Sequence, residues 1–251
     1  MVAVQIIRAK VSLFATLSDL LTFVRQPGLT EPSSRTLSQS IKTGLWLFLM
    51  SLAVTAIFAL LTVPLMLVSG AAPGGPLREV FTQPILSVVV SVVVLGPLIE
   101  EIIFRGWLTG TWRSITGSAL FLFIFYGGAV LMTDLVVGPP VVKQLGLAGL
   151  GMGALWLIRP LDSGTRVVGY KRVFPFLFWG QGIVFGALHY QNVAADSVVV
   201  GFISTLPLIV CAWLWGYARI VLGLGGAVLL HAAYNIPAAV GLIVLMTMQA
   251  A

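Results

Sequence analysis

Long apolar runs separated by short polar breaks dominate the chain from residue 45 onward. Residues 45–68 contain no charged residue, and at about 1.5 Å of rise per residue they are long enough to cross a bilayer as a helix. A shorter, glycine-rich run at 144–158 is typical of a tilted, short or re-entrant span. The remaining apolar runs lie at 85–99, 114–133, 173–195, 197–218 and 220–251. The pattern predicts an all-α, polytopic transmembrane helix bundle of about seven spans.

The first 42 residues follow a different pattern. Within residues 1–25, apolar side chains recur at helical spacing, and most polar side chains fall elsewhere. These apolar residues are Leu13, Phe14, Leu17, Leu20, Leu21 and Val24. The spacing predicts an amphipathic helix that lies on the membrane or packs against the bundle. Residues 26–42 begin with a stretch rich in proline and serine, which predicts a linker, so the bundle is expected to occupy residues 43–251.

The composition points to the same class of protein. Of the 251 residues, 59% are apolar and only 9% are charged, against about 25% charged residues in a soluble domain. So few charges cannot cover the surface of a soluble enzyme, and they also exclude a disordered chain. The net charge of +6 comes from basic residues between the apolar runs, which indicates loop charges rather than a surface for nucleic acid.

The distribution of loop charges predicts an orientation. The region through Lys42 holds five basic and two acidic residues, and the loops 105–113 and 159–172 are also basic. The loops 70–83 and 134–143 are balanced. This alternation predicts seven spans with the N-terminus in the cytoplasm. Because arginine outnumbers lysine and Ala, Gly and Val are abundant, we expect a bacterial inner-membrane protein.

Scarce polar residues gather at three places inside the apolar runs. Two of only four glutamates are adjacent, at Glu100 and Glu101. Both histidines lie in apolar runs; Asn192 follows His189 and Asn235 follows His231. Ionisable groups inside a membrane are costly, so they are candidates for a functional site.

The two glutamates are predicted to differ in environment. On a helix, Glu101 and Arg105 share a face at i, i+4, whereas Glu100 is rotated from Glu101 by about 100°. Arg105 is thus expected to neutralise Glu101 while Glu100 points into the bundle, where it suits a general base or acid. A simple ion pair at a helix end would explain Glu101 and Arg105, but not Glu100.

The histidines allow both structural and functional interpretations. His189, at i+4 from Phe185, fits a histidine bonded to a backbone carbonyl. His231 and Asn235, also at i, i+4, fit a polar contact between helices. The three clusters together favour a common site. The tryptophans, among them Trp215, are interpreted as interfacial anchors.

The segments EEIIFRG at 100–106, FGALH at 185–189 and HAAYN at 231–235 resemble the EExxxRG, FxxxH and HxxxN motifs of the CPBP family, in the same order. This family comprises the Rce1-type CAAX prenyl endopeptidases and the bacteriocin-processing and immunity proteins, also called Abi proteins. The resemblance covers about residues 84–240. The stretch from Arg105 to Phe185 is longer than is usual in the family, with room for two extra spans.

The resemblance implies an intramembrane glutamic endopeptidase that acts on a membrane-associated peptide or protein, with no cofactor. Glu100 would activate the water and His189 would hold it. His231 and Asn235 would stabilise the oxyanion, and Glu101 and Arg105 would support the site. These residue types can supply an activated nucleophile and oxyanion donors.

Three alternatives remain open from the sequence. Zinc held by Glu100, His189 and His231 would make the site a metalloprotease, although no HExxH helix is present. A non-catalytic member of the family would serve as a scaffold, immunity or assembly subunit with a membrane-protein partner. A proton relay or transporter would use the same residues, but no internal repeat supports it.

The predicted topology creates a problem of depth. It places His189 in the outer half of its span and His231 near the inner end of the last span. For the two to meet, the helices must be broken or tilted. Glycines at Gly180, Gly182, Gly186, Gly223, Gly225 and Gly226 permit such bends or close packing.

Overall fold

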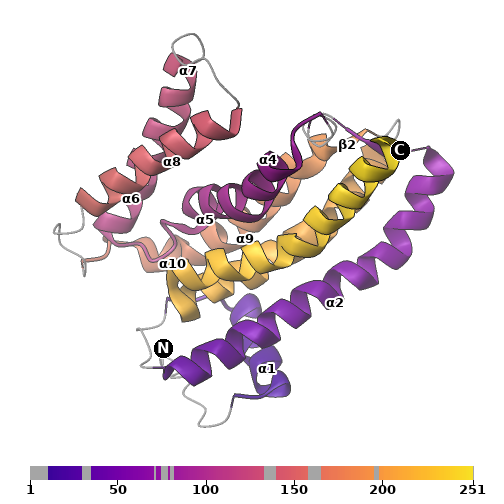
Figure 1. Cartoon of the computed structure of the whole chain (residues 1–251). Coiled ribbons are helices and arrows are strands. Elements are labelled where there is room, and N and C mark those ends of the chain that lie inside the picture. Colours follow the sequence, from indigo (N-terminus) through magenta and orange to yellow (C-terminus); the bar gives the residue numbers. More distant parts are fainter. Residues whose placement is uncertain are drawn as a thin grey trace.

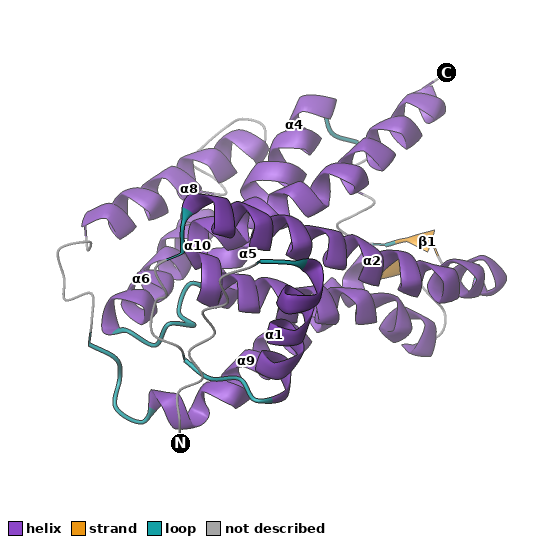
Figure 2. Cartoon of the chain, turned by 90° about the horizontal axis from the view of Figure 1, so that it is seen from below, coloured by secondary structure: helices purple, strands orange, loops and turns teal. Residues whose placement is uncertain are grey.

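The computed structural model describes residues 11–29, 35–70, 72–74, 79, 82–132, 140–157, 165–194 and 198–250. Outside these ranges lie the first ten residues of the predicted amphipathic segment and the loop acids Asp134, Asp162 and Asp196. The described part is an all-α bundle, as the apolar runs predict (Figure 2).

The helices follow the apolar runs. In chain order the elements are α1 (Leu13–Arg25), α2 (Leu37–Ser69), β1 (Ala72–Pro73), α4 (Ile85–Val89), η1 (Val90–Leu95), α5 (Gly96–Arg105), α6 (Trp112–Leu122), η2 (Phe123–Gly127), α7 (Gly128–Met132), α8 (Pro140–Leu157), α9 (Tyr170–Leu188), η3 (His189–Asn192), β2 (Val193–Ala194) and α10 (Val198–Ala250). The segments η1 and η2 are π-helical turns inside longer helices, and η3 is a 3₁₀ turn.

Within the described ranges, five helical segments are long and apolar enough to cross a membrane: Leu37–Ser69, Ile85–Arg105, Trp112–Val130, Tyr170–Asn192 and Val198–Met248. A shorter apolar helix covers Val141–Leu157, where the sequence predicts a short or tilted span. Each of the seven predicted runs therefore corresponds to a helical segment in the described ranges, because α10 contains the last two; Val193–Ala194, at the end of the run 173–195, forms β2 instead.

The helix α10 reverses direction at Gly223. This glycine has φ 81° and ψ 178°, which is not helical, and glycine adopts such a conformation without a steric penalty. Trp215 and His231 would be about 24 Å apart on a straight helix, yet their ring centroids are 3.9 Å apart. Gly223 divides α10 into two halves, residues 198–222 and 224–250. The two halves therefore pair as an antiparallel hairpin (orange and yellow in Figure 1).

The N-terminal helix α1 is tied to the bundle. Its buried side chains Leu20 and Phe23 join the main core, where the Phe23 ring lies against Phe174, Phe178 and Tyr217. Phe14, Leu17 and Leu21 of the same helix are exposed. The helix α2 begins at Leu37, with a capping box formed by Thr36 and Gln39. The helix thus starts inside the predicted linker 26–42, because a threonine followed by glutamine three residues later stops the linker early.

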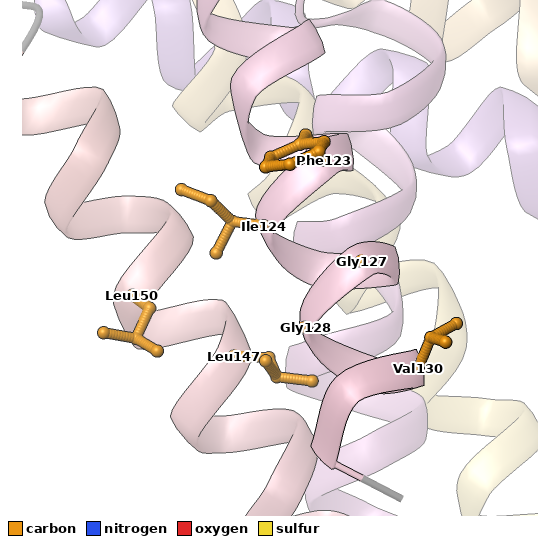
Figure 3. A pocket seen from close by; sticks show the side chains of 7 residues that line it. All are labelled: Phe123, Ile124, Gly127, Gly128, Val130, Leu147 and Leu150. Atoms are coloured by element: carbon orange, nitrogen blue, oxygen red, sulfur yellow. The ribbon is translucent and has the colours of Figure 1, made fainter.

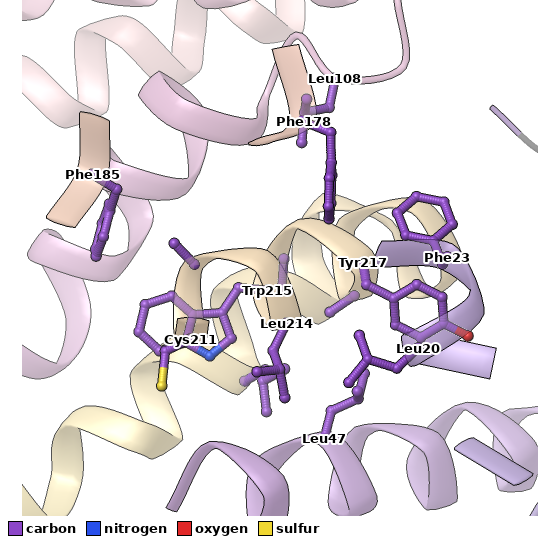
Figure 4. Packing of buried hydrophobic residues seen from close by; sticks show 14 of the residues in the cluster. Leu20, Phe23, Leu47, Leu108, Phe178, Phe185, Cys211, Leu214, Trp215 and Tyr217 are labelled. Atoms are coloured by element: carbon purple, nitrogen blue, oxygen red, sulfur yellow. The ribbon is translucent and has the colours of Figure 1, made fainter. Parts of the chain in front are cut away.

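The main core lies between α1, α2, α9 and both halves of α10 (Figure 4). Trp215, Tyr217, Phe178 and Phe185 are among its fully buried members. The helices α6, α7 and α8 form a separate group that leans away from this core (Figure 1). Phe123, Ile124, Gly127, Leu147 and Leu150 of this group are among the residues that line an apolar cavity of about 480 Å³ (Figure 3).

One end of the bundle carries a group of basic residues. One end joins the C-terminal end of α5 to the start of α9 and to the residues just before Gly223. Basic residues of this end are Arg105, Lys171, Arg172 and Arg219. The opposite end carries β1 and β2, which pair antiparallel with Ala72 opposite Ala194.

Candidate active site

The helix α5 places its two glutamates in different environments. Glu101 forms an ion pair with Arg105 one turn later, and both side chains are fully buried. The Glu100 side chain is 31% exposed. The helical spacing predicts this division, since one arginine occupies one carboxylate and leaves the other open. The open carboxylate can meet a water molecule or substrate, whereas the closed one cannot.

His231 connects the two glutamates. Its Nδ1 lies 2.9 Å from Oε1 of Glu101, and its Nε2 lies 3.6 Å from Oε2 of Glu100. Because a carboxylate only accepts hydrogen bonds, Nδ1 carries the proton in the contact with Glu101. Glu101 therefore holds two partners, Arg105 and His231, and it fixes the ring with Nε2 turned towards Glu100.

Aromatic rings hold His231 from two sides. Trp215 stacks on it with ring centroids 3.9 Å apart and planes at 21°. Phe185 approaches edge-on at 6.0 Å. The Arg105 guanidinium carbon lies 4.9 Å from the Phe185 centroid and 5.4 Å from that of Trp215. The interpretation of Trp215 as an interfacial anchor is therefore wrong, because the reversal at Gly223 carries it into the core, where its side chain is fully buried.

His189 lies immediately after the last residue of α9, at the start of η3. Its Nδ1 is 2.7 Å from the carbonyl oxygen of Phe185, so Nδ1 donates and, in the neutral ring, Nε2 is left free as an acceptor. Its ring lies 4.4 Å from that of Phe185. Phe185 thus stands between the two histidines and contacts both, which brings the second and third motifs to one region despite the depth that the topology predicts.

Asn235 makes a different contact from the one that its motif implies. Its Nδ2 donates to the carbonyl oxygen of Val92, at 2.9 Å. That oxygen lacks its usual main-chain donor, because the Gly96 N–H bonds to Ser91 in the π-helical turn. The next amide along the chain belongs to Pro97, which has no N–H. The asparagine therefore satisfies a carbonyl that the turn and the proline leave free, and one of its two amide hydrogens remains.

Four ionisable side chains meet at this place. Glu100 and Glu101 bring two carboxyl groups, Arg105 brings a guanidinium and His231 brings an imidazole. Such an arrangement offers a carboxylate base beside hydrogen-bonding groups.

The geometry also bears on a metal ion. In the ranges that the structure describes, no group of three or more His, Cys, Asp and Glu side chains has the arrangement of a metal site. Glu100 and His231 are near one another, while the polar contact of His189 is with the Phe185 carbonyl. The zinc alternative would need Glu100, His189 and His231 to converge further than they do here.

The structure thus brings Glu100, Glu101, Arg105 and His231 into direct contact. It places Asn235 against η1, and it links His189 to the others through Phe185. Sequence reasoning missed Trp215 and Val92, and it gave Phe185 no role. The motif spacing pointed to Phe185, but only the reversal of α10 reveals Trp215.

A comparison with known protein families finds one match, in a segment that contains the first motif. Residues 82–161 match the family model described as type II CAAX prenyl endopeptidase Rce1-like. The match contains Glu100, Glu101 and Arg105 and extends through α8, whereas the second and third motifs lie beyond it. No curated protein and no solved structure shows a significant match to the chain. The match covers less than half of the chain, and it supports the resemblance to the CPBP and Rce1-like family that the three motifs in their order predict.

Proposed function

We propose that the chain is an intramembrane endopeptidase that hydrolyses a peptide bond of a membrane-associated substrate. A CAAX protease-type membrane endopeptidase is what the family supports in general. The specific mechanism that we propose rests on the different surroundings of the two glutamates of α5. Glu101 is fully buried and binds Arg105 and His231, while Glu100 remains partly open beside His231.

In the proposed reaction, Glu100 accepts a proton from a water molecule whose oxygen attacks the peptide carbonyl carbon. The free Nε2 of His189 accepts the second hydrogen of that water and orients it. The negative charge that develops on the carbonyl oxygen is met by Nε2–H of His231 and by the remaining amide hydrogen of Asn235. The protonated Glu100 then gives its proton to the leaving amine, and the C–N bond breaks. The carboxylate returns to its starting state.

We infer the membrane orientation from the basic end of the bundle. Basic residues at the α5–α9 end, such as Lys171 and Arg172, support a cytoplasmic location for that end by the positive-inside rule. On this proposal the N-terminus is on the same side of a bacterial inner membrane. The exposed apolar side chains of α1, Phe14, Leu17 and Leu21, enter the membrane interface beside the bundle. The partners are lipid and a peptide or protein substrate, and no cofactor is required.

A peptide cleavage assay tests the proposal. The purified chain is reconstituted into phosphatidylethanolamine–phosphatidylglycerol liposomes and given a peptide with a prenylated C-terminal CAAX sequence, alongside the same peptide without the lipid. Proteins in membranes of cells that express the chain are probed in parallel by labelling new N-termini. Cleavage of either kind of substrate by the wild type, lost in Glu100→Gln, is the expected result.

A matched control separates chemistry from folding. Glu79→Gln makes the same change at an exposed residue and is expected to keep full activity. If Glu100→Gln cleaves as well as the wild type, or if it restores the biological task of a deletion strain, the endopeptidase proposal fails. The second of these outcomes would favour the scaffold or immunity role. Proton-coupled uptake into vesicles would favour a transporter.

A further inference from the structure

Side chains from several elements donate hydrogen bonds to the turn at residues 105–110, which follows the first motif. A helix ends with carbonyl groups that have no partner within the helix, and in a membrane an unsatisfied carbonyl is costly. In the turn after α5, the carbonyls of Arg105 and Trp107 accept from the N–H groups of Leu108 and Gly110. Side chains from segments far away in the sequence add further hydrogen bonds to the same turn.

Arg219 makes the principal contact. Its Nε donates to the carbonyl oxygen of Arg105 at 2.9 Å, and its Nη2 donates to that of Gly106 at 3.1 Å. The guanidinium thus binds two successive carbonyls with two nitrogens, a geometry that a planar fork provides and a lysine does not. A cation at the C-terminal end of a helix is also favoured by the helix dipole.

Two further side chains continue the same pattern. The Tyr170 hydroxyl donates to the carbonyl of Trp107 at 2.9 Å, and Nε of Arg166 donates to that of Thr109 at 3.3 Å. The main chain adds a bond from the Val167 N–H to the Gly110 carbonyl, at 2.9 Å. The end of α5 is therefore fixed to α9, to the segment before it and to the first half of α10.

The position of Arg219 gives this contact a consequence for the site. It lies four residues before the reversal at Gly223, on the same hairpin that carries Trp215 and His231. Its carbonyl partner Arg105 is the residue that pairs with Glu101. One arginine thus ties the helix of the glutamates to the hairpin of the histidine, next to the point where the hairpin turns.

We propose that Arg219 is a positioning residue, which sets the register between α5 and α10 so that Glu100 and His231 face each other. The proposal rests on the proposed function for its effect on catalysis, but its structural content stands separately. Arg219 touches neither carboxylate, so it acts through the carbonyls of Arg105 and Gly106. Tyr170 supports the same turn from α9.

The test uses hydrogen–deuterium exchange and kinetics on the full-length chain in detergent or liposomes. Arg219→Gln is expected to increase amide exchange in residues 104–112, and to lower kcat about 10- to 100-fold, as small misplacements of catalytic groups do, with KM changed much less. Arg172→Gln removes the same charge from an exposed residue at the start of α9 and is the control. It is expected to leave both measurements unchanged.

Chemical rescue distinguishes the loss of the Arg219 contact from misfolding of the variant. In Arg219→Ala, added guanidinium chloride at low, non-denaturing concentration is expected to restore part of the lost exchange protection and part of kcat, whereas equal sodium chloride is not. Wild-type exchange in residues 104–112 of Arg219→Gln would overturn the proposal, whatever its activity. If the wild type cleaves no peptide, the exchange data still decide the proposal about Arg219, while the proposed function fails on its own.

Discussion

Trp215 lies nearly parallel to His231, with ring centroids 3.9 Å apart, because the chain reverses midway between them at Gly223. The histidine is thereby held by a ring on one face, by Glu101 at Nδ1 and by the edge of Phe185. Side chains locked in this way keep a catalytic group in its productive geometry. Trp215 therefore belongs to the support of the site rather than to the membrane interface.

Replacing this ring tests its role. Trp215→Leu is expected to lower the thermal stability of the protein, because such aromatic pairs contribute about 0.5–1.5 kcal/mol beyond their buried area. It is also expected to reduce kcat about ten-fold, because the imidazole loses a fixed plane. Trp215→Phe keeps an aromatic face and is expected to retain more activity. Equal activity in the two variants would mean that bulk, not the aromatic face, is what the site requires.

Removing the charge of each glutamate should affect a different property: the stability of the fold for Glu101 and peptide cleavage for Glu100. Glu101→Gln leaves the buried Arg105 without its counter-charge, which is expected to destabilise the protein by about 3–5 kcal/mol. Glu100→Gln removes a partly open carboxylate and is expected to change the melting temperature little while abolishing cleavage. Differential scanning fluorimetry and the peptide assay on both variants measure this contrast. A larger loss of stability in Glu100→Gln would reverse the assignment of the two residues.

The contact between Asn235 and Val92 predicts a partial rescue. Asn235→Ala leaves the Val92 carbonyl unpaired, at an expected cost of about 1–3 kcal/mol. Adding Pro97→Ala supplies a backbone N–H that can bond to this carbonyl, so the double variant should regain stability relative to Asn235→Ala. Activity should not return, because the proposed oxyanion donor is still missing. Restoration of both properties would assign Asn235 a purely structural role.

The glycine of the first motif is expected to be intolerant of any side chain. A Cβ on Gly106 would meet Oγ of Ser118 at 2.3 Å and the carbonyl oxygen of Ile102 at 2.5 Å. Gly106→Ala should therefore lower the melting temperature and the activity together. Gly180→Ala is the control, since its Cβ meets nothing within 4 Å, and alanine is favoured over glycine in a helix. Wild-type behaviour of Gly106→Ala would show that the turn after α5 tolerates displacement.

Chelators address the zinc alternative. Activity in 1,10-phenanthroline or EDTA is expected to equal that of the untreated protein, because Glu100, His189 and His231 do not converge as a ligand set in the described structure. Loss of cleavage that added zinc restores would support a metalloprotease instead. A variant with His189→Gln provides a second check, since metal content measured by mass spectrometry should not depend on it.

The apolar runs and a few spacings predict much of this architecture. The all-α bundle follows from hydropathy, and the Glu101–Arg105 pair follows from i, i+4 geometry, because both depend only on local sequence. The separate runs 197–218 and 220–251 predict a reversal near Arg219, and the structure has it four residues later, at Gly223, one of the glycines at which the sequence permits a bend. A reversal changes which distant residues meet, so no local pattern could reveal that Trp215 stacks on His231.

The contacts of Asn235 and Arg219 were unpredictable for a related reason. Both bind backbone carbonyls, and a carbonyl carries no mark in the sequence. Val92 needs a donor only because η1 shifts the hydrogen-bond register just before Pro97. The start of α2 at Leu37 could have been predicted from the sequence, because Thr36 and Gln39 have the spacing of a capping box. The prediction followed the proline- and serine-rich composition instead and extended the linker to residue 42.

In the proposed reaction, Glu100 delivers a water molecule to a peptide carbonyl. Cleavage in water enriched in ¹⁸O, followed by mass spectrometry of the products, measures this step. A single turnover by the wild type is expected to place one ¹⁸O in the new carboxylate, and Glu100→Gln is expected to form no labelled product. Cleavage without incorporation of the label, or equal labelled product from Glu100→Gln, would contradict it.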